Sequence, residues 1–385
     1  MTGDVGAKQT CRLRPGTAAA PTRFGEYFLV GLAARGGMAE VYRARRADRP
    51  GELFAVKVIR QTLSGDERFV DMFRREGRLA VMLGGPCIVS TFEAGEFEGV
   101  PFIAMEYLSG CDLNTLLRLC QRRDQRIPIP LALHVVSCVL QGLDVAHNLR
   151  GADGRPLNLV NRDVSPSNVR LTFEGAVKLL DFGIARALMK FTSEIGVLKG
   201  KLSYMSPEQA RGLPVDARSD LFSAGIVLHE LLTGEKLFRG DSEFALMEAV
   251  STAAVQAPSR FNRRVSAELD RIVGRALERD RSARFQSASD FASELGELLA
   301  AYKFEPRELR EFMRRLMRRE HDDELARVRE ITAVDLSSAG AQPAIDRGGG
   351  ASPPPIPEVE SVREVTETTK REPGFWNKLR RKKKS

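Results

Sequence analysis

The first third of the chain contains short apolar runs that predict strands, with one helical segment among them. The runs "YFLVGLAA" (27–34) and "LFAVKVIR" (53–60) are rich in the apolar residues typical of strands, and "CIVSTFEAGEFEGVPFIAMEYL" (87–108) predicts a further pair. Between them, "DERFVDMFRREGRLAVML" (66–83) has helical spacing, because its larger apolar residues fall on one side: Phe69, Met72, Phe73, Leu79 and Met82.

After Asp112 the pattern changes to helices. The segments "LALHVVSCVLQGLDVAHNL" (131–149) and "SDLFSAGIVLHELLTG" (219–234) are apolar on most sides, as buried helices are, and the second ends on Gly234, a favourable C-terminal cap. A small strand-rich lobe followed by a larger helical lobe is an α+β arrangement. We therefore expect a ligand to bind in the cleft between the lobes.

The remainder of the chain divides into a helical extension and two unstructured ends. Residues 301–335 include an amphipathic stripe at helical spacing, which predicts a charged helix that packs on the helical lobe or, as the alternative, binds a partner: Leu309, Phe312, Met313, Leu316 and Met317. Residues 1–23 and 336–385 are polar, the second segment containing "GGGASPPPIP", and are predicted to be disordered. The main domain is therefore expected to cover residues 24–300.

The positive charge is concentrated at one end. The last twelve residues, "GFWNKLRRKKKS", hold six of the positive charges and no acid, and so account for most of the net charge of +8. Such a run is most often a solvated end. The sharper hypothesis is peripheral binding to an anionic membrane surface, with Phe375 and Trp376 at the interface. Nucleic acid is an unlikely partner, because the main domain shows no second basic segment.

Cysteine usage and hydropathy predict the compartment. The five cysteines are scattered without a C-x-x-C pair, which suggests neither a zinc site nor a disulfide framework. No uncharged apolar run reaches the roughly 18 residues of a membrane span. The N-terminal residues also lack the apolar run of a secretory signal. These features predict a cytoplasmic protein, with peripheral attachment to the inner membrane as a further option.

Two features of the strand-rich lobe suggest phosphate binding. The turn "ARGGMAEV" (34–41) contains glycines, which let backbone N–H groups approach a phosphate, although such hairpins are often only structural. Lys57 is a charge inside an apolar strand, and Glu76 follows nineteen residues later in the predicted helix. The two side chains are suited to form an ion pair in which the lysine holds phosphates, or one that is merely structural.

The segment "VNRDVSPSNVRLTFEGAVKLLDFGIAR" (160–186) carries the strongest chemical signal. Asp163 is placed to orient an attacking hydroxyl and accept its proton, while Asn168 and Asp181 offer hard oxygen ligands suited to Mg²⁺. If these residues were only helix caps or turn residues, they would not need to follow one another in this order along the chain.

With these positions in order, the chain resembles bacterial eukaryotic-like (Hanks-type) serine/threonine protein kinases over about residues 25–300. The resemblance implies a two-lobed protein-kinase fold, ATP and Mg²⁺ as cofactors, and protein substrates. It places a set of residues around the nucleotide: Ala34, Gly36, Gly37, Val41, Ala55, Lys57, Glu76, Met105 at the adenine pocket, and Glu106 and Leu108 in the hinge. It also implies that Glu208 pairs with Arg284, and that Asp220 anchors the catalytic loop from beneath.

The chain departs from the family pattern at several positions. Ala34 and Ala39 replace glycines, and Asn161 replaces a histidine that supports the catalytic loop. Ser165 stands where a lysine usually faces the γ-phosphate, and Lys201 stands where a threonine is usual. We hypothesise that these two residues have exchanged roles, the alternative being that Lys201 faces solvent or substrate.

An arginine beside the catalytic aspartate predicts regulation by phosphorylation. Arg162 precedes Asp163, and in this family such an arginine is usually neutralised by a phosphate on the activation segment. Thr192 is the preferred acceptor and Ser193 the second, unless Glu194 already supplies the negative charge.

Two other functions compete with that of an active protein kinase. One is a catalytically weak nucleotide-binding scaffold, which the retained Lys57, Asp163 and Asp181 disfavour. The other is a small-molecule phosphotransferase, which the long activation segment, Asp220 and Arg284 disfavour because they build a platform for a polypeptide.

Overall fold

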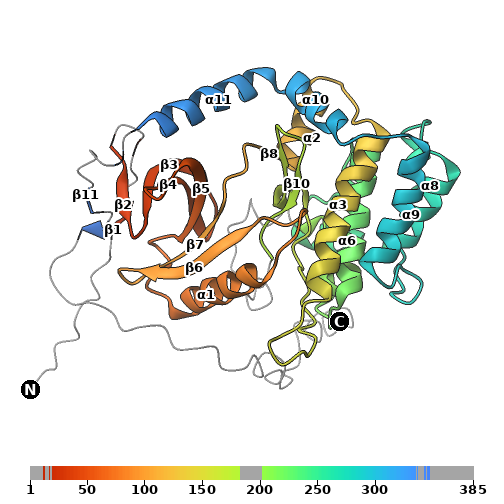
Figure 1. Cartoon of the computed structure of the whole chain (residues 1–385). Helices are drawn as coiled ribbons and strands as arrows, with labels where there is room; N and C mark the ends of the chain where they lie inside the picture. Colours follow the sequence, from red (N-terminus) through yellow and green to blue (C-terminus); the bar gives the residue numbers. More distant parts are fainter. Residues whose placement is uncertain are drawn as a thin grey trace, which may run out of the picture.

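The computed structural model describes residues 20–182 and 202–334, with short pieces at 12–13, 17, 336, 342–343 and 345–346. Figure 1 shows strands and one helix on one side and a group of helices on the other, joined through the middle of the molecule. The predicted α+β arrangement of two lobes is confirmed. Thr192, Ser193, Lys201 and the basic tail lie outside the described residues, so the expected membrane contact stays a prediction.

The small lobe is a twisted sheet with the strand order β11-β2-β3-β4-β5-β7-β6. One helix, α1 (Glu67–Met82), packs against β6 and β7, and the Asp66 side chain caps its first turn by accepting from the Arg68 N–H. Aromatic residues of this lobe form its core, Phe24, Tyr27, Phe54 and Phe102 among them. The strands are β2 (Thr22–Phe24), β3 (Tyr27–Arg35), β4 (Ala39–Arg46), β5 (Arg49–Ile59), β6 (Thr91–Phe97), β7 (Val100–Glu106) and β11 (Gln342–Pro343).

The large lobe is built around two buried helices, α3 (Ile129–His147) and α6 (Ala217–Thr233), which pack against each other. The predicted cap of α6 is present, since Gly234 adopts a left-handed φ of 78°. Shorter helices surround this pair: α2 (Leu113–Arg122), α5 (Pro207–Ala210), α7 (Glu243–Thr252), α8 (Ala267–Ala276) and α9 (Ala288–Ala301). Short turns η1 (Pro166–Asn168) and η3 (Pro258–Arg260) and a small sheet, β8 (Gly110–Asp112), β9 (Val169–Thr172) and β10 (Val177–Leu179), complete it.

Within the described residues, α3 is the single helix long and apolar enough to cross a membrane, and 72% of its apolar 18-residue window is buried in the protein. This is the pattern of a core helix. The four described cysteines, Cys87, Cys111, Cys120 and Cys138, are free and buried.

The helical extension differs from its prediction. It forms two helices, α10 (Arg307–Leu316) and α11 (Arg318–Ala333), because the backbone leaves helical geometry at Met317 with φ −121° and ψ 40°. The predicted apolar stripe lies on α10 and at Met317, where it is buried in the core of the large lobe. Packing on the helical lobe thus holds for α10 and for the first turn of α11, where the His321 ring lies 4.9 Å from the Phe173 ring. It is wrong for the rest of α11, which crosses to the strands of the small lobe (Figure 1).

Short strands also form where the sequence predicts disorder. β1 (Arg12–Leu13) pairs with β12 (Ile345–Asp346), and β11 adds to β2 at the edge of the main sheet. An open sheet edge offers unpaired backbone groups, which explains why β11, a polar segment of low strand propensity, can pair with β2.

Candidate active site

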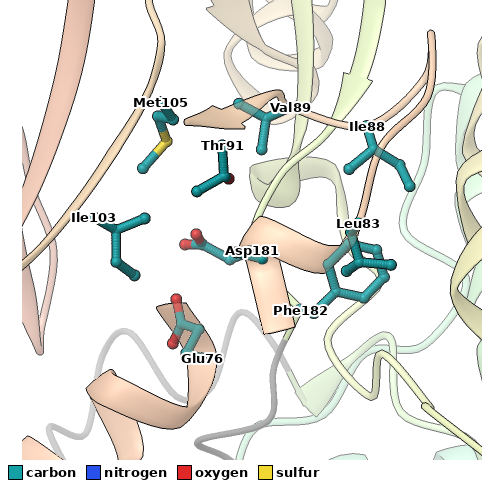
Figure 2. Close-up of a pocket in the computed structure, with 10 residues that line it drawn as sticks. Glu76, Leu83, Ile88, Val89, Thr91, Ile103, Met105, Asp181 and Phe182 are labelled. Carbon is teal, nitrogen blue, oxygen red and sulfur yellow. The ribbon is translucent and has the colours of Figure 1, made fainter. Parts of the chain in front are cut away.

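Lys57 on β5 joins two carboxylates from different elements. Its Nζ lies 2.6 Å from Glu76 Oε1 on α1 and 2.7 Å from Asp181 Oδ1, which follows β10. Burial acts to lower the pKa of Lys57, but the Asp181 and Glu76 carboxylates outweigh it and raise this pKa, so the lysine is charged. Figure 2 shows the Glu76 and Asp181 carboxylates facing the same space. The structure therefore fixes a cation where the two lobes meet.

A small cavity lies beside this cluster. Its volume is about 20 Å³, which is room for about one water molecule and too little for a nucleotide. Most of its wall is apolar, and Met105 and Phe182 line it together with Glu76 and Asp181 (Figure 2). This enclosed cavity is therefore not itself a nucleotide pocket, although it shares Glu76, Met105 and Asp181 with the predicted nucleotide site.

The catalytic loop brings Asp163 and Asn168 together through η1. The Asn168 side-chain amide donates to the Asp163 carbonyl oxygen at 2.9 Å and to its carboxylate Oδ2 at 2.8 Å. Both side chains are buried. Because the amide nitrogen of Asn168 is committed to Asp163, its oxygen is the atom left to face a cation.

Asp220 on α6 holds the catalytic loop from below. Its carboxylate accepts from the backbone N–H groups of Asn161 and Arg162, each at 2.8 Å, and its Oδ2 also lies 2.8 Å from His147 Nε2. Arg162 has a left-handed φ of 64°, which is costly for a residue with a side chain. The two hydrogen bonds from the loop to Asp220 explain how this conformation is maintained.

His147 supports Asp220 and was not predicted from the sequence. It is the last residue of α3, and its ring contacts Asp220 from a helix 73 residues earlier in the chain. A lone histidine at the end of an apolar helix was the available signal, but nothing in the sequence pairs it with Asp220.

Asn161 uses both ends of its amide. It is fully buried, its Oδ1 accepts from the Asp163 N–H at 3.0 Å, and its Nδ2 donates to the Asp181 carbonyl at 3.4 Å. One side chain thus connects the two segments that carry Asp163 and Asp181. The loss of a histidine at this position leaves neither backbone group without a partner.

Ser165 is buried, and its hydroxyl lies 3.0 Å from the Ser167 hydroxyl. Lys201, its hypothetical counterpart, lies outside the described residues. The exchange of roles between Ser165 and Lys201 therefore stays a prediction.

The turn and hinge residues surround the same cleft. Ala34 pairs with Val41 across β3 and β4, and the Gly36 N–H donates to the Ala39 carbonyl at 2.8 Å. A Cβ on Gly36 would lie 3.3 Å from that carbonyl oxygen, so the turn is tight enough to favour glycine. Gly37 lies in the same turn, and Ala55 lies opposite Met105 across β5 and β7.

Two hinge residues are held from the large-lobe side. Glu106 Oε1 accepts from the Ser90 N–H at 2.7 Å and from Lys178 Nζ at 2.8 Å. The Leu108 carbonyl accepts from the Arg170 guanidinium at 3.0 and 3.2 Å.

Glu208 and Arg284 form a buried bidentate ion pair beneath the site. The guanidinium donates to the two carboxylate oxygens at 2.8 and 2.9 Å, and the Ser219 hydroxyl donates to Glu208 Oε1 at 2.6 Å. The pair connects α5, which follows the segment 183–201, to the loop before α9. It anchors α5 to the rest of the large lobe.

Comparison with known proteins places this geometry in a family. A family described as "Protein kinase domain" matches residues 30–295, more than half of the chain. The tyrosine-protein kinase MasK of Myxococcus xanthus is 39% identical over 282 residues, covering 72% of this chain and 44% of MasK. The serine/threonine-protein kinase PknB of Mycobacterium tuberculosis is 36% identical over 267 residues, covering 68% of this chain and 41% of PknB.

A solved structure agrees with the sequence matches. The crystal structure of the Mycobacterium tuberculosis PknI kinase domain is similar with a TM-score of 0.55 and 29% identity, covering 72% of this chain and 98% of that domain. A two-lobed fold with a Lys–Glu–Asp cluster in its cleft is the architecture of a kinase. This chain belongs to the protein kinase domain family. It spans less than half the length of MasK and PknB.

Proposed function

We propose that this protein is a serine/threonine protein kinase that transfers the γ-phosphoryl group of ATP to hydroxyls of proteins, itself included. The observation that carries the proposal is that Lys57 contacts Glu76 and Asp181 at once, while the Asn161 side chain connects Asp181 to the loop that holds the Asp163–Asn168 pair. Serine/threonine specificity is supported by the likeness to PknB, whereas MasK is named a tyrosine kinase.

The residues present fit ATP with a divalent cation, and Mg²⁺ is our proposed cation. Asp181 and Asn168 provide hard oxygen ligands, and the charged Lys57 would hold phosphate oxygens. Bound ATP would supply the phosphoryl group, and the metal would neutralise part of its negative charge. Asp163 would orient the attacking hydroxyl and accept its proton, as the hydroxyl oxygen forms a bond to the γ-phosphorus and the P–O bond to the leaving ADP breaks.

The intact cluster disfavours a nucleotide-binding scaffold without activity. In such a protein Lys57, Asp163 or Asp181 is typically lost, and here they occupy one connected set of contacts.

Purified protein incubated with labelled ATP and Mg²⁺ is expected to label itself and a generic protein substrate on serine and threonine. Phosphopeptides of the chain are expected to contain Thr192 or Ser193. Burial lowers the pKa of the Arg162 guanidinium, and the Asp220 carboxylate offsets this only in part, so an added phosphate would stabilise the charge of Arg162. Phosphotyrosine alone would contradict the specificity. Labelling of small molecules but of no protein would favour the phosphotransferase alternative.

Lys201→Thr is expected to slow phosphoryl transfer by roughly 10²–10³-fold if Lys201 supplies the cation that Ser165 cannot. Adding Ser165→Lys to that variant is expected to restore much of the rate, which initial rates of the four proteins would measure as a double-mutant cycle. Lys199→Thr is the matched control, because it removes a lysine two positions away. Nearly full turnover in Lys201→Thr would disprove the exchange of roles.

A further inference from the structure

The C-terminal extension connects the two lobes behind the hinge. α10 is held in the large lobe by its apolar stripe, and Arg314 on this helix donates to the Phe173 carbonyl at 3.0 Å. The Arg123 side chain of α2 donates to the Leu316 carbonyl at 2.5 Å, at the break between the two helices. From there α11 runs past β8 toward β3, β4 and β5 (Figure 1). One end of the extension is therefore anchored to the large lobe.

The other end of the extension is anchored to the small lobe. Arg45 on β4 is buried, and its Nη1 donates to the Ile331 carbonyl at 3.0 Å and to the Val334 carbonyl at 2.5 Å. These carbonyls belong to the last turn of α11 and the residue after it, where the helix dipole favours a cation. Ile331 itself is buried. Residues 318–334 thus span the two lobes, and we call this segment the hinge strap.

The middle of the hinge strap contacts the hinge itself. Glu324 is buried, with 8% of its surface exposed, and its carboxylate accepts from the hydroxyl of Tyr107. Tyr107 lies between Glu106 and Leu108, in the segment expected to bind the adenine. The Arg43 guanidinium donates to the Tyr107 hydroxyl at 2.9 Å and lies 3.9 Å from Glu324 Oε2. A carboxylate from the extension and an arginine from β4 therefore fix the hinge tyrosine.

The chemistry of this network favours a single arrangement. Burial, with the hydrogen bond to Glu324, raises the pKa of Tyr107, so its hydroxyl remains a donor to Glu324. Arg43 Nη1 also donates to the Leu32 carbonyl on β3 at 2.9 Å, and the Arg43 guanidinium lies over the Tyr107 ring. Because buried polar groups are costly to leave unpaired, the partners hold one another in place.

We propose that Glu324 is a positioning residue for nucleotide binding: through Tyr107 and Arg43, the hinge strap holds the hinge in the arrangement that accepts ATP. The proposal rests on the proposed kinase function and adds a determinant outside the catalytic domain matched by the family. Lobe movement in such enzymes occurs at the hinge, so a segment anchored on both lobes restricts it. A hinge ordered before binding reduces the fraction of protein in a binding-incompetent state, and so lowers the apparent Kd.

Glu324→Ala is expected to raise the Kd for Mg-ADP by about 3–30-fold, the range of a coupling carried by one contact. Calorimetry on the full chain measures this without requiring catalysis. Tyr107→Phe is expected to have a similar effect. The double variant Tyr107→Phe with Glu324→Ala is expected to show less than the sum of the two effects, because both changes remove the Tyr107–Glu324 hydrogen bond, while Tyr107→Phe also removes the one from Arg43. Glu324→Gln keeps an acceptor and is expected to bind more tightly than Glu324→Ala. Glu330→Ala, an exposed glutamate of the same helix, is the matched control and should bind like the unaltered protein.

Hydrogen exchange of the hinge peptide in nucleotide-free protein separates this proposal from its premise. Faster exchange at residues 106–108 is expected in Glu324→Ala and not in Glu330→Ala. A lower melting temperature of Glu324→Ala with unchanged hinge exchange and unchanged Kd would overturn the proposal and leave a purely stabilising strap. If the unaltered protein bound no nucleotide, the kinase function would be contradicted, and the hinge exchange would still decide the role of Glu324.

Discussion

Asp181→Asn is expected to reduce phosphoryl transfer by roughly 10²–10³-fold or more, because it removes a charge that acts on the reacting phosphates. The substitution keeps the size of the side chain and removes its negative charge. That charge accepts from Lys57 at 2.7 Å, and as a proposed metal ligand it also holds the cation. Initial rates of autophosphorylation, measured with labelled ATP at saturating Mg²⁺, give the effect.

The control for this experiment is Asp153→Asn, which makes the same chemical change in a turn whose aspartate side chain is 55% exposed. We expect its rate to match that of the unaltered protein. Undiminished activity in Asp181→Asn would mean that the labelling comes from a contaminating kinase, and the assignment of the site would then be wrong.

Glu208→Ala is expected to lower the free energy of unfolding by about 3–5 kcal/mol, the usual cost of breaking a buried ion pair by removing one partner. The Arg284 side chain is 0% exposed, so its charge would lose a bidentate partner without gaining water. Three carbonyls, those of Glu278, Arg218 and Arg279, still accept from it and reduce the loss. Urea unfolding followed by circular dichroism measures the difference.

Glu235→Ala is the matched control, because it breaks a glutamate–arginine pair whose side chains are 54% and 64% exposed. Pairs of this kind contribute little, and we expect a change below about 0.5 kcal/mol. Equal losses in the two variants would show that burial of the Glu208–Arg284 pair has no special effect.

The Glu208–Arg284 pair also predicts a dependence of stability on pH. Burial acts to raise the pKa of Glu208, but the hydrogen bonds from Arg284 and Ser219 outweigh it and hold this pKa below its ordinary value of 4.5. A carboxyl whose folded pKa is lowered stabilises the protein above its unfolded pKa. This contribution is lost as the pH falls below 4.5 and through the pKa that Glu208 has in the folded protein. The stability of Glu208→Ala should therefore fall less steeply over this acid range.

Much of the site could be predicted because its residues are close along the chain. Asp163 and Asn168 are five positions apart, so the geometry of one tight turn brings them together. Lys57 was recognisable because it is a charge inside an apolar strand, and Glu76 because it follows in a predicted helix from which it can pair with that lysine. The sequence could not predict the support that His147 gives to Asp220, because a histidine at a helix end fits many environments.

By itself, the sequence determined the main strands of the small lobe, the helices α1, α3 and α6 and the Gly234 cap, since each depends on local spacing and conformational preference. Only the tertiary structure decided the course of α11. Its sequence is charged on most sides, with Glu324 and Ile331 as its buried residues, so no apolar stripe indicates what it contacts. Glu324 meets Tyr107 across 217 positions of the chain. Such a contact depends on how α10 packs and where the backbone turns at Met317, and periodicity along a segment carries no information about either.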